Sequence, residues 1–295
     1  MKDQAEVLRH RLDKLRTKKH TKAISVISGK GGVGKSNFSL NFAIALSQKG
    51  KSVLVFDMDI GMGNIDILMG STSSKNIVHF FEGSLPLEEV ISKGPADISY
   101  IAGGTGLPTI FQMAPEMVDQ FFKEFERIME DYDYIIFDMG AGISEDTVPF
   151  LLAGDEIFVI TTPEPTSVTD AYAAIKYLAL QQQSIPFFLI CNKAGDEKEG
   201  KLTLNRLQNV VRQFLKLEMN VLGVLPDDKI VSKSVIRQTP FIINSPSSKI
   251  STALNILISS YLSNEYPEVP LESIKGFVSR LRQFVFGRKE SPWKQ

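Results

Sequence analysis

Short apolar runs alternate with stretches of helical spacing along most of this chain. The apolar runs predict strands at Ile24–Ile27, Ser52–Phe56, Ile98–Ile101, Tyr134–Phe137, Glu156–Thr161, Pro186–Cys191 and Asn220–Val224. Apolar positions three and four apart predict helices over Lys35–Lys49, Ile77–Phe81, Pro115–Asp131, Ser144–Ala153, Ser167–Gln182, Lys201–Leu217 and Lys249–Leu262. Several strands are apolar on both faces, as parallel strands are. The pattern predicts an α/β fold with a single doubly wound, mostly parallel sheet that binds ligands at the carboxyl ends of its strands.

The two ends of the chain follow other patterns. Residues 1–22 form a short amphipathic helix by pattern, with Ala5, Leu8, Leu12 and Leu15 on one stripe. Tyr266–Pro270 holds two prolines and predicts a linker. Three parts follow: a helical extension over 1–22, an α/β domain over 23–265 and an amphipathic helix within 271–295. No signal peptide and no apolar run of membrane-spanning length is expected.

A glycine-rich loop after the first strand carries the strongest chemical signal. Residues Gly29 to Ser36 read G-K-G-G-V-G-K-S, and a helical pattern follows. Backbone N–H groups at such a loop and helix N-terminus bind phosphate. The expected nucleotide-binding residues are Gly29, Lys30, Gly31, Gly32, Val33, Gly34, Lys35 and Ser36. Lys35 is expected to reach the β- and γ-phosphates and the Ser36 hydroxyl to bind Mg²⁺. The alternative is a glycine-rich turn of some other α/β protein.

Acidic residues follow two later strands at the same edge of the predicted sheet. Asp57 and Asp59 end the second strand, and the D-x-D spacing points both side chains to one side. Asp138 ends the strand Tyr134–Phe137, with Gly140 two residues on. Phosphoryl transfer needs a carboxylate near Mg²⁺ and a group that orients water. Ser36, Asp57 and Asp138 are therefore the expected metal site. The alternative for Asp57 and Asp59 is an acidic pair that merely caps the strand.

The segment K-G-G-V-G-K-S resembles the deviant Walker A motif of the MinD/ParA family, because Lys30 precedes the usual Lys35. The resemblance extends through the D-x-D-I-G-x-x-N-I-D segment that begins at Asp57. It implies that ATP bridges two protomers, that Lys30 reaches the partner's nucleotide, and that Asp59 positions the attacking water. The expected catalytic residues are thus Asp59, Lys30 and Lys35. The alternative for Lys30 is a solvated loop lysine.

The base site is also carried over from this family. Asn192 ends a strand in N-K-x-G, and the resemblance implies that it contacts adenine. The guanine-reading N-K-x-D of GTPases is similar, but Gly195 stands where the aspartate is needed. The backbone near Pro226 and Asp228 is the second expected base contact, on a looser match.

The segment Asp3-Gln4-Ala5-Glu6-Val7-Leu8-Arg9 matches the D-Q-A-x-x-L-R activator helix of the FlhG (YlxH) group within this family. In that group the helix stimulates the FlhF GTPase, so Gln4, Leu8 and Arg9 are the expected partner contacts. The resemblance implies control of flagellar number and placement and assistance to flagellar switch (C-ring) proteins in basal-body assembly. A helix that merely caps the domain is the alternative.

Charge separates the ends from the body. Residues 1–22 and 274–295 each carry +5, which leaves −11 on residues 23–273 of a total of −1. The stripe Phe277, Val278, Leu281, Phe284 and Val285, with arginines around it, predicts a helix that binds an anionic membrane surface. Packing of this helix on its own domain is the alternative, disfavoured by the linker and by the lack of acidic residues. We expect a cytoplasmic protein at the inner face of the cell membrane.

Composition narrows the remaining functions. One cysteine, Cys191, excludes an intrachain disulfide and argues against the iron–sulfur relatives of this fold. The acidic body disfavours a DNA-segregation ATPase, and the D-Q-A-x-x-L-R segment disfavours a division-site regulator. An ATP-using metabolic enzyme would need a second substrate site, of which the sequence gives no sign. ATP and Mg²⁺ are the expected cofactors, a homodimer the expected assembly, and nucleic acid no expected partner.

Overall fold

The computed structural model describes residues 21–59, 63–71, 73–103, 115–144, 147–181, 185–263 and 276–287. The expected partner contacts Gln4, Leu8 and Arg9 lie outside these residues. The remaining site residues named above are all described.

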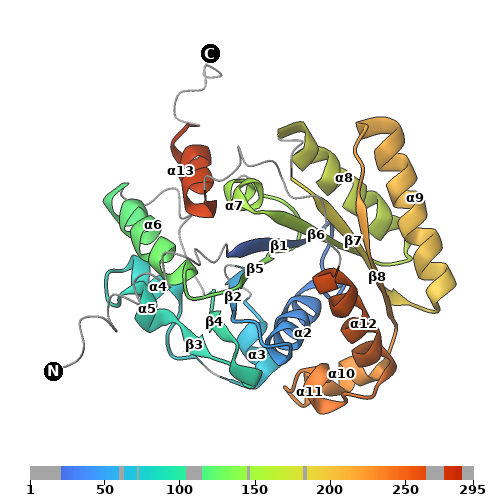
Figure 1. Ribbon diagram of the computed structural model, residues 1–295, viewed down its shortest axis with the longest axis horizontal. Helices are drawn as coiled ribbons and strands as arrows, with labels where there is room; N and C mark the ends of the chain where they lie inside the picture. Colours follow the sequence, from blue (N-terminus) through green and yellow to red (C-terminus); the bar gives the residue numbers. More distant parts are fainter. Residues whose placement is uncertain are drawn as a thin grey trace, which may run out of the picture.

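One twisted sheet forms the centre of the described chain (Figure 1). Its eight strands lie in the order β3-β4-β2-β5-β1-β6-β7-β8. In chain order they are β1 (Lys22–Ser28), β2 (Val53–Met58), β3 (Ser92–Lys93), β4 (Ser99–Ile101), β5 (Tyr134–Met139), β6 (Glu156–Thr161), β7 (Phe187–Ala194) and β8 (Asn220–Pro226). All neighbours pair in parallel except the short edge strand β3, which is antiparallel to β4. The predicted doubly wound, mostly parallel sheet is confirmed.

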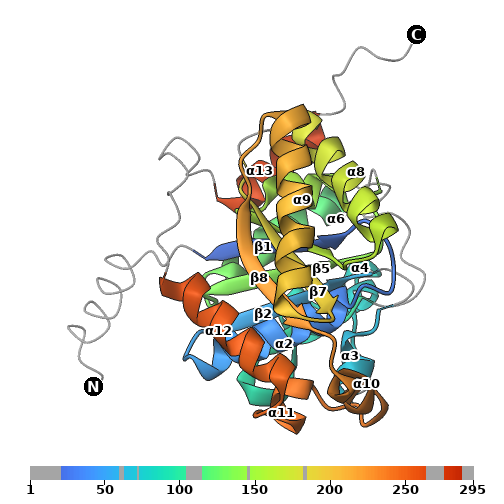
Figure 2. The same ribbon diagram turned by 90° about the vertical axis from the view of Figure 1, so that its right-hand side faces the viewer.

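Helices cover both faces of the sheet, each over its own hydrophobic core. One face holds α4 (Ile77–Phe81), α5 (Leu87–Val90), α6 (Pro115–Met129), α7 (Val148–Ala153), α8 (Pro165–Gln181), α9 (Glu197–Leu215) and α13 (Phe277–Gly287). The other holds α2 (Lys35–Gln48), α3 (Ile65–Met69), α11 (Phe241–Asn244) and α12 (Lys249–Ser263), with α10 (Lys229–Ile236) at its margin. Figure 2 shows α9 and α12 at the β8 edge, on which both helices pack.

The expected strands are all present, within a few residues of the predicted bounds. The pattern missed the short elements α3, α5, α10, α11, β3 and the 3₁₀ turn Pro95–Asp97. Elements of two to eight residues span about two helical turns at most and show no readable periodicity. The predicted helix from Ser144 was wrong at its start, because α7 begins only at Val148. Ser144 instead forms a turn in which its N–H and hydroxyl both approach the Thr147 hydroxyl.

Register gathers the polar residues at one edge. Asp57 of β2 lies directly opposite Asp138 of β5, and Val26 of β1 is the next partner along. The carboxyl ends of β1, β2, β5 and β7 therefore meet at one edge of the sheet, as parallel strands must. The glycine-rich loop, both acidic strand ends and Asn192 all lie there.

Candidate nucleotide site

The loop between β1 and α2 has a backbone that only glycine adopts readily. Gly32 and Gly34 have φ of 79° and 91°, in the left-handed region that disfavours a side chain. A Cβ on Gly29 would lie 2.2 Å from the backbone carbon of Asp170 on α8. The loop thus packs directly on the α8 backbone, and α2 begins at Lys35 with its first N–H groups free for an anion.

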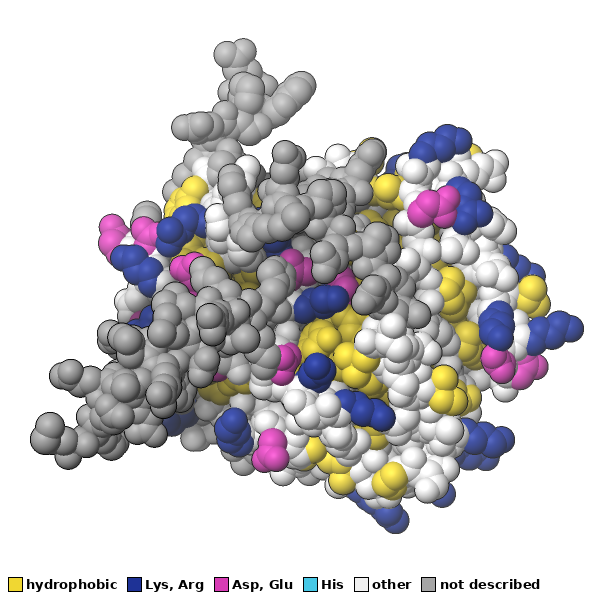
Figure 3. All heavy atoms as spheres, viewed as in Figure 1, with side chains coloured by type: hydrophobic (Ala, Val, Ile, Leu, Met, Phe, Trp, Pro, Cys, Tyr) yellow, Lys and Arg dark blue, Asp and Glu magenta, His cyan; other side chains and the backbone are white. Residues whose placement is uncertain are grey.

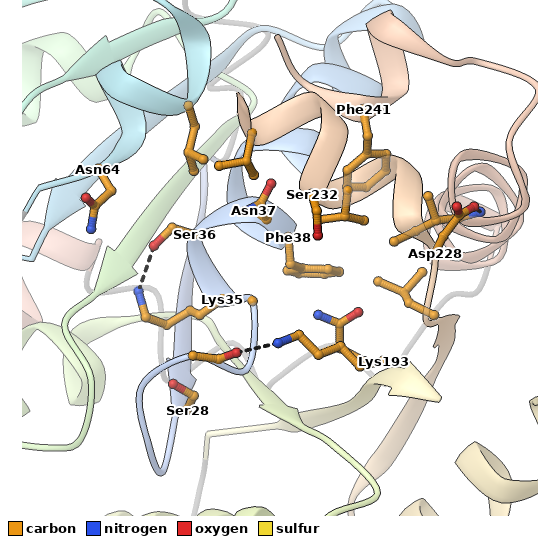
Figure 4. Close-up of a pocket in the computed structure, with 18 of the residues that line it drawn as sticks. Ser28, Lys35, Ser36, Asn37, Phe38, Asn64, Lys193, Asp228, Ser232 and Phe241 are labelled. Atoms are coloured by element: carbon orange, nitrogen blue, oxygen red, sulfur yellow. Dashed lines mark hydrogen bonds between the residues drawn. The ribbon is translucent and has the colours of Figure 1, made fainter. Parts of the chain in front are cut away.

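Lys35 points across this loop to the acidic strands. Its Nζ donates to Asp138 Oδ1 at 2.8 Å and lies 3.4 Å from the Ser36 hydroxyl (Figure 4). Ser39, one turn along α2, donates to the same Oδ1 at 2.7 Å. Ser39 was not among the expected site residues, because only its position four residues after Lys35 marks it.

The structure places two of the expected metal ligands, Asp57 and Asp138, opposite each other on neighbouring strands. Asp138 is fully buried, and its Oδ2 atom has no hydrogen-bond partner in the described structure. A buried carboxylate oxygen without a donor fits Mg²⁺ or an Mg²⁺-bound water. Among the described residues no group of three His, Cys, Asp or Glu side chains could cage a metal. Mg²⁺ in nucleotide sites is held by one or two carboxylates together with substrate phosphates and waters.

The ionised form of Asp57 is disfavoured by its surroundings. Burial, and next the charge of Asp138, raises its pKa from 3.8 to about 7. Three backbone N–H groups, of Asp59, Asn64 and Ile65, donate to its carboxylate. The bonds from Asp59 and Ile65 oppose the rise in pKa. A carboxylate kept poised in this way is typical of a functional site.

Asp59 lies less deeply, at the point where β2 leaves the sheet. A Cβ on Gly140 would lie 3.5 Å from Asp59 Oδ1, so this carboxylate faces the backbone of the loop after β5. Burial raises the pKa of Asp59 and the Lys35 charge opposes the rise. The Asp59 side chain therefore lies near Gly140 and lines the cavity described below.

Lys30 does not join Lys35 and the carboxylates. Its Nζ donates to Glu164 Oε2 at 2.5 Å and to the Thr166 hydroxyl at 3.0 Å, both at the start of α8. The hydrogen bond from Lys30, and next the Lys30 charge, lowers the pKa of Glu164, which is exposed. Glu164 and Thr166 were not among the expected site residues, because nothing in their local sequence marks a partner for the loop.

The expected base contacts line the other end of the site. The Asn192 side-chain N–H donates to the Val33 carbonyl at 2.8 Å, and Lys193 donates to the Gly32 carbonyl at 2.7 Å (Figure 4). Asn192 therefore supports the loop as well as lining the cavity. The Asp228 carboxylate accepts from Ile230 N–H at 2.9 Å and caps α10. The backbone near Pro226 and Asp228 is the expected base contact, whereas the Asp228 side chain caps α10.

A cavity of about 640 Å³ unites these parts, within the usual range for small-molecule sites. Its polar end holds the loop, Lys35 and Asp59, and its far wall is made by α10, α11 and α12 (Figure 4). A phosphate-binding loop at one end and a largely apolar wall at the other suit a nucleotide.

The C-terminal helix α13 packs on the domain, contrary to expectation. Phe277, Val278 and Leu281 are buried on the domain, and Phe284 and Val285 pack partly against the same core. We expected this helix to stand apart for want of acidic partners, and that was wrong for the described structure. Asp155 and Asp119 of the domain supply the missing countercharge to Arg280 and Arg282. The prediction that the stripe meets a membrane stays a prediction.

Loop, carboxylates and cavity together define a P-loop nucleotide-binding protein. A family model described as ParA, NUBPL iron-transfer P-loop NTPase, matches residues 19–261. The flagellum site-determining protein YlxH of Helicobacter pylori is 36% identical over 273 residues, covering 91% of this chain and 92% of that protein. The antiactivator FleN of Pseudomonas aeruginosa is 33% identical over 260 residues, covering 88% and 93%. The chain belongs to the ParA/MinD family of P-loop NTPases and is of the FlhG (YlxH) type, as expected.

Solved structures agree on the fold. MinD in the MinC:MinD cell division complex of Aquifex aeolicus has a TM-score of 0.66 at 24% identity, covering 84% of this chain and 98% of that one. MinD of Pyrococcus horikoshii complexed with Mg-ADP has a TM-score of 0.65 at 23% identity, covering 82% and 96%. Family membership makes the chain an ATPase of the P-loop class.

The description of the family model mentions iron transfer, and cysteine thiolates are the usual ligands of iron–sulfur clusters. Cys191 is the one cysteine of the chain, it is fully buried in β7, and burial raises its pKa to about 12. No described helix has the length and apolarity needed to cross a bilayer.

Proposed function

We propose that this protein is an ATP-dependent dimerising switch that regulates flagellar number and placement. The observation that carries the proposal is the position of Lys30. Its ammonium lies on Glu164 and Thr166 rather than beside Lys35. A lysine held at the rim by an exposed carboxylate is available to a phosphate outside its own loop. The exposed ion pair costs little to break, since such pairs contribute about 0–1 kcal/mol.

The chain's own residues divide the work of hydrolysis. The loop amides and Lys35 would bind the phosphates, and Ser36, Asp57 and Asp138 would hold Mg²⁺. Bound Mg²⁺ neutralises charge on the phosphate oxygens. Asp59 orients the attacking water, facing the loop that holds Gly140. Lys35 exchanges its Asp138 contact for the phosphate, which frees Asp138 for the metal. Slow turnover suits a switch that must persist in its ATP state.

Dimer formation tests this proposal most directly. Asp59→Ala should keep ATP binding, lose hydrolysis and accumulate a dimer with Mg²⁺ and ATP, measured by size-exclusion chromatography with light scattering. Lys30→Gln in that background should return the protein to a monomer. Lys193→Gln is the matched control, because Lys193 also contacts the loop but lies at the base end. A dimer that survives Lys30→Gln would refute the assignment of Lys30.

Membrane binding is the second part of the proposal. Phe277, Val278, Leu281, Phe284 and Val285 would enter the lipid surface once α13 leaves its groove on the domain. One such helix binds weakly, and two on one dimer bind more strongly through effective concentration. Flotation of the chain with anionic liposomes should require ATP and should be lost in Phe277→Asp. Flotation of Phe277→Asp equal to the wild type would assign α13 a purely structural role.

The partner follows from the first residues of the chain. We assign to residues 1–22 the stimulation of the FlhF GTPase, with Gln4, Leu8 and Arg9 as contacts, and to the whole protein assistance to flagellar switch (C-ring) proteins. The name of the YlxH relative, a flagellum site-determining protein, supports a flagellar role. A synthetic peptide of residues 1–22 should raise GTP turnover by FlhF, and Gln4→Ala should weaken the effect. A flat response to the peptide, with the whole protein active, would move the activity to the ATPase body.

A ParA-type DNA-segregation or MinD-type division-site role is the competing function. The face seen in Figure 3 carries its Lys and Arg side chains scattered singly, with Asp and Glu beside several of them. Non-specific DNA binding needs clustered positive charge. Retention on DNA only with ATP, at physiological salt, would favour segregation over the flagellar role.

A further inference from the structure

The groove that holds α13 is built mainly from phenylalanine. α13 lies between α6 and α7 in Figure 1, and both helices contact it. The Phe277 ring stacks on Phe137 of β5 with centroids 4.9 Å apart. It meets the rings of Phe125 and Phe150 at interplanar angles of 62° and 42°. Once α13 leaves for a membrane, as proposed above, this aromatic floor would face water. An apolar surface of that kind is costly to expose and calls for another occupant.

One aspartate anchors the helix over this floor. Arg280 Nη2 donates to Asp155 Oδ1 at 2.5 Å, and Arg280 Nε donates to the Ala153 carbonyl at 2.8 Å. The other oxygen, Asp155 Oδ2, accepts the backbone N–H of Ala23 at 2.8 Å. Asp155 therefore joins α13 to the first residues of β1.

The first residues of the chain repeat the pattern of α13. Ala5, Leu8, Leu12 and Leu15 have the same spacing as Ile274, Phe277, Leu281 and Phe284. When Leu12 is placed on Leu281, Arg11 falls on Arg280, the residue that binds Asp155. Lys14 falls on Gln283, which is exposed in the structure. Residues 5–15 thus carry both the apolar stripe and the anchoring arginine that this groove accepts.

The described chain begins at Thr21, beside the end of α6. The Thr21 hydroxyl donates to the Met129 and Tyr132 carbonyls, at and just after the end of α6. The five residues from Arg16 to His20, which join residues 5–15 to Thr21, span up to roughly 17 Å when extended. Residues 1–22 carry +5, and the groove offers Asp155 inside and Asp119 at its rim. Reach and charge both suit an intramolecular contact.

We infer that residues 5–15 are the second occupant of the α6–α7 groove and bind there when α13 leaves it. The two ends of the chain then exclude one another from a single site. This regulation rests on the proposed function: with α13 on a membrane, the activator segment is withheld from the GTPase, and with α13 docked it is available.

Hydrogen exchange on the full-length chain tests the contact without any lipid. Phe277→Asp/Leu281→Asp sets two carboxylates against the phenylalanine floor and should release α13. Amides of residues 277–287 should exchange faster, and amides of residues 5–15 should exchange at least about tenfold more slowly than in the wild type, as ordered helical amides do. Arg280→Glu is an independent variant that leaves the apolar stripe intact and places a carboxylate against Asp155. It should also speed exchange in residues 277–287 and slow exchange in residues 5–15.

The matched substitutions lie in the segment itself. In either α13 variant, Arg11→Glu should abolish the protection of residues 5–15. Lys14→Glu is an equal charge change at the position that matches exposed Gln283, and it should keep the protection. Residues 5–15 exchanging at the rate of a free peptide after α13 has left would overturn the inference. So would an α13 that stays protected in both variants, or protection that grows with protein concentration, which would point to a second copy. Failure of liposome flotation would reject the membrane role and leave this result intact.

Discussion

Replacement of Asp57 by asparagine should change how the stability of the ligand-free protein depends on pH. Asp57 is 2% exposed, and its pKa rises to about 7 in the folded chain from 3.8. Between these two pH values the folded state keeps a proton that the unfolded state has released. The free energy of unfolding therefore falls as pH rises from about 4 to about 7, and this contribution is constant above.

The size of the effect follows from the shift. A difference of about three pH units between folded and unfolded pKa corresponds to roughly 4 kcal/mol at 1.36 kcal/mol per unit. Asparagine resembles the protonated acid and does not titrate. It cannot accept all three backbone hydrogen bonds, which costs about 1–3 kcal/mol at every pH. The informative quantity is therefore the change with pH of the difference between variant and wild type.

Urea unfolding from pH 5 to pH 8, with chelator and without nucleotide, measures this difference. The free energy of unfolding of Asp57→Asn should gain on that of the wild type as pH rises from 5 to about 7, and the difference should level off towards pH 8. Asp131→Asn is the control, because Asp131 is exposed at the opposite edge of the sheet. Parallel curves for Asp57→Asn and wild type, or a relative loss with rising pH, would refute the electrostatic account of this carboxylate.

Other variants test separate parts of the site and fold. Lys35→Gln should abolish ATP binding in titration calorimetry, whereas Asp59→Ala should bind ATP normally and lose phosphate release; wild-type turnover in the latter would remove Asp59 from the mechanism. Gly200→Ala should lower stability by about 1–3 kcal/mol, because the added Cβ would lie 2.3 Å from a Val224 methyl. Val224→Ala should relieve much of that loss in the double variant, and additive losses in urea would contradict the packing argument.

The sheet was predictable because buried parallel strands read as continuous apolar runs. Every predicted strand is present, and the carboxylates at the ends of β2 and β5 meet because register forces them together. The roles of Ser39, Glu164 and Thr166 were not predictable, since each depends on elements far apart in the sequence. Docking of α13 was missed for the same reason: local charge showed no acidic partner, and Asp155 supplies one from the end of α7.

Cys191 has a practical consequence for spectroscopy. A fully buried thiol whose pKa is about 12 stays protonated and reacts slowly with maleimides near neutral pH. The natural chain can therefore serve as its own cysteine-free background. A cysteine introduced at Gln4 and another at exposed Ser279 would be labelled selectively, and the distance between two such probes could follow both ends of the chain through a cycle of ATP binding and hydrolysis.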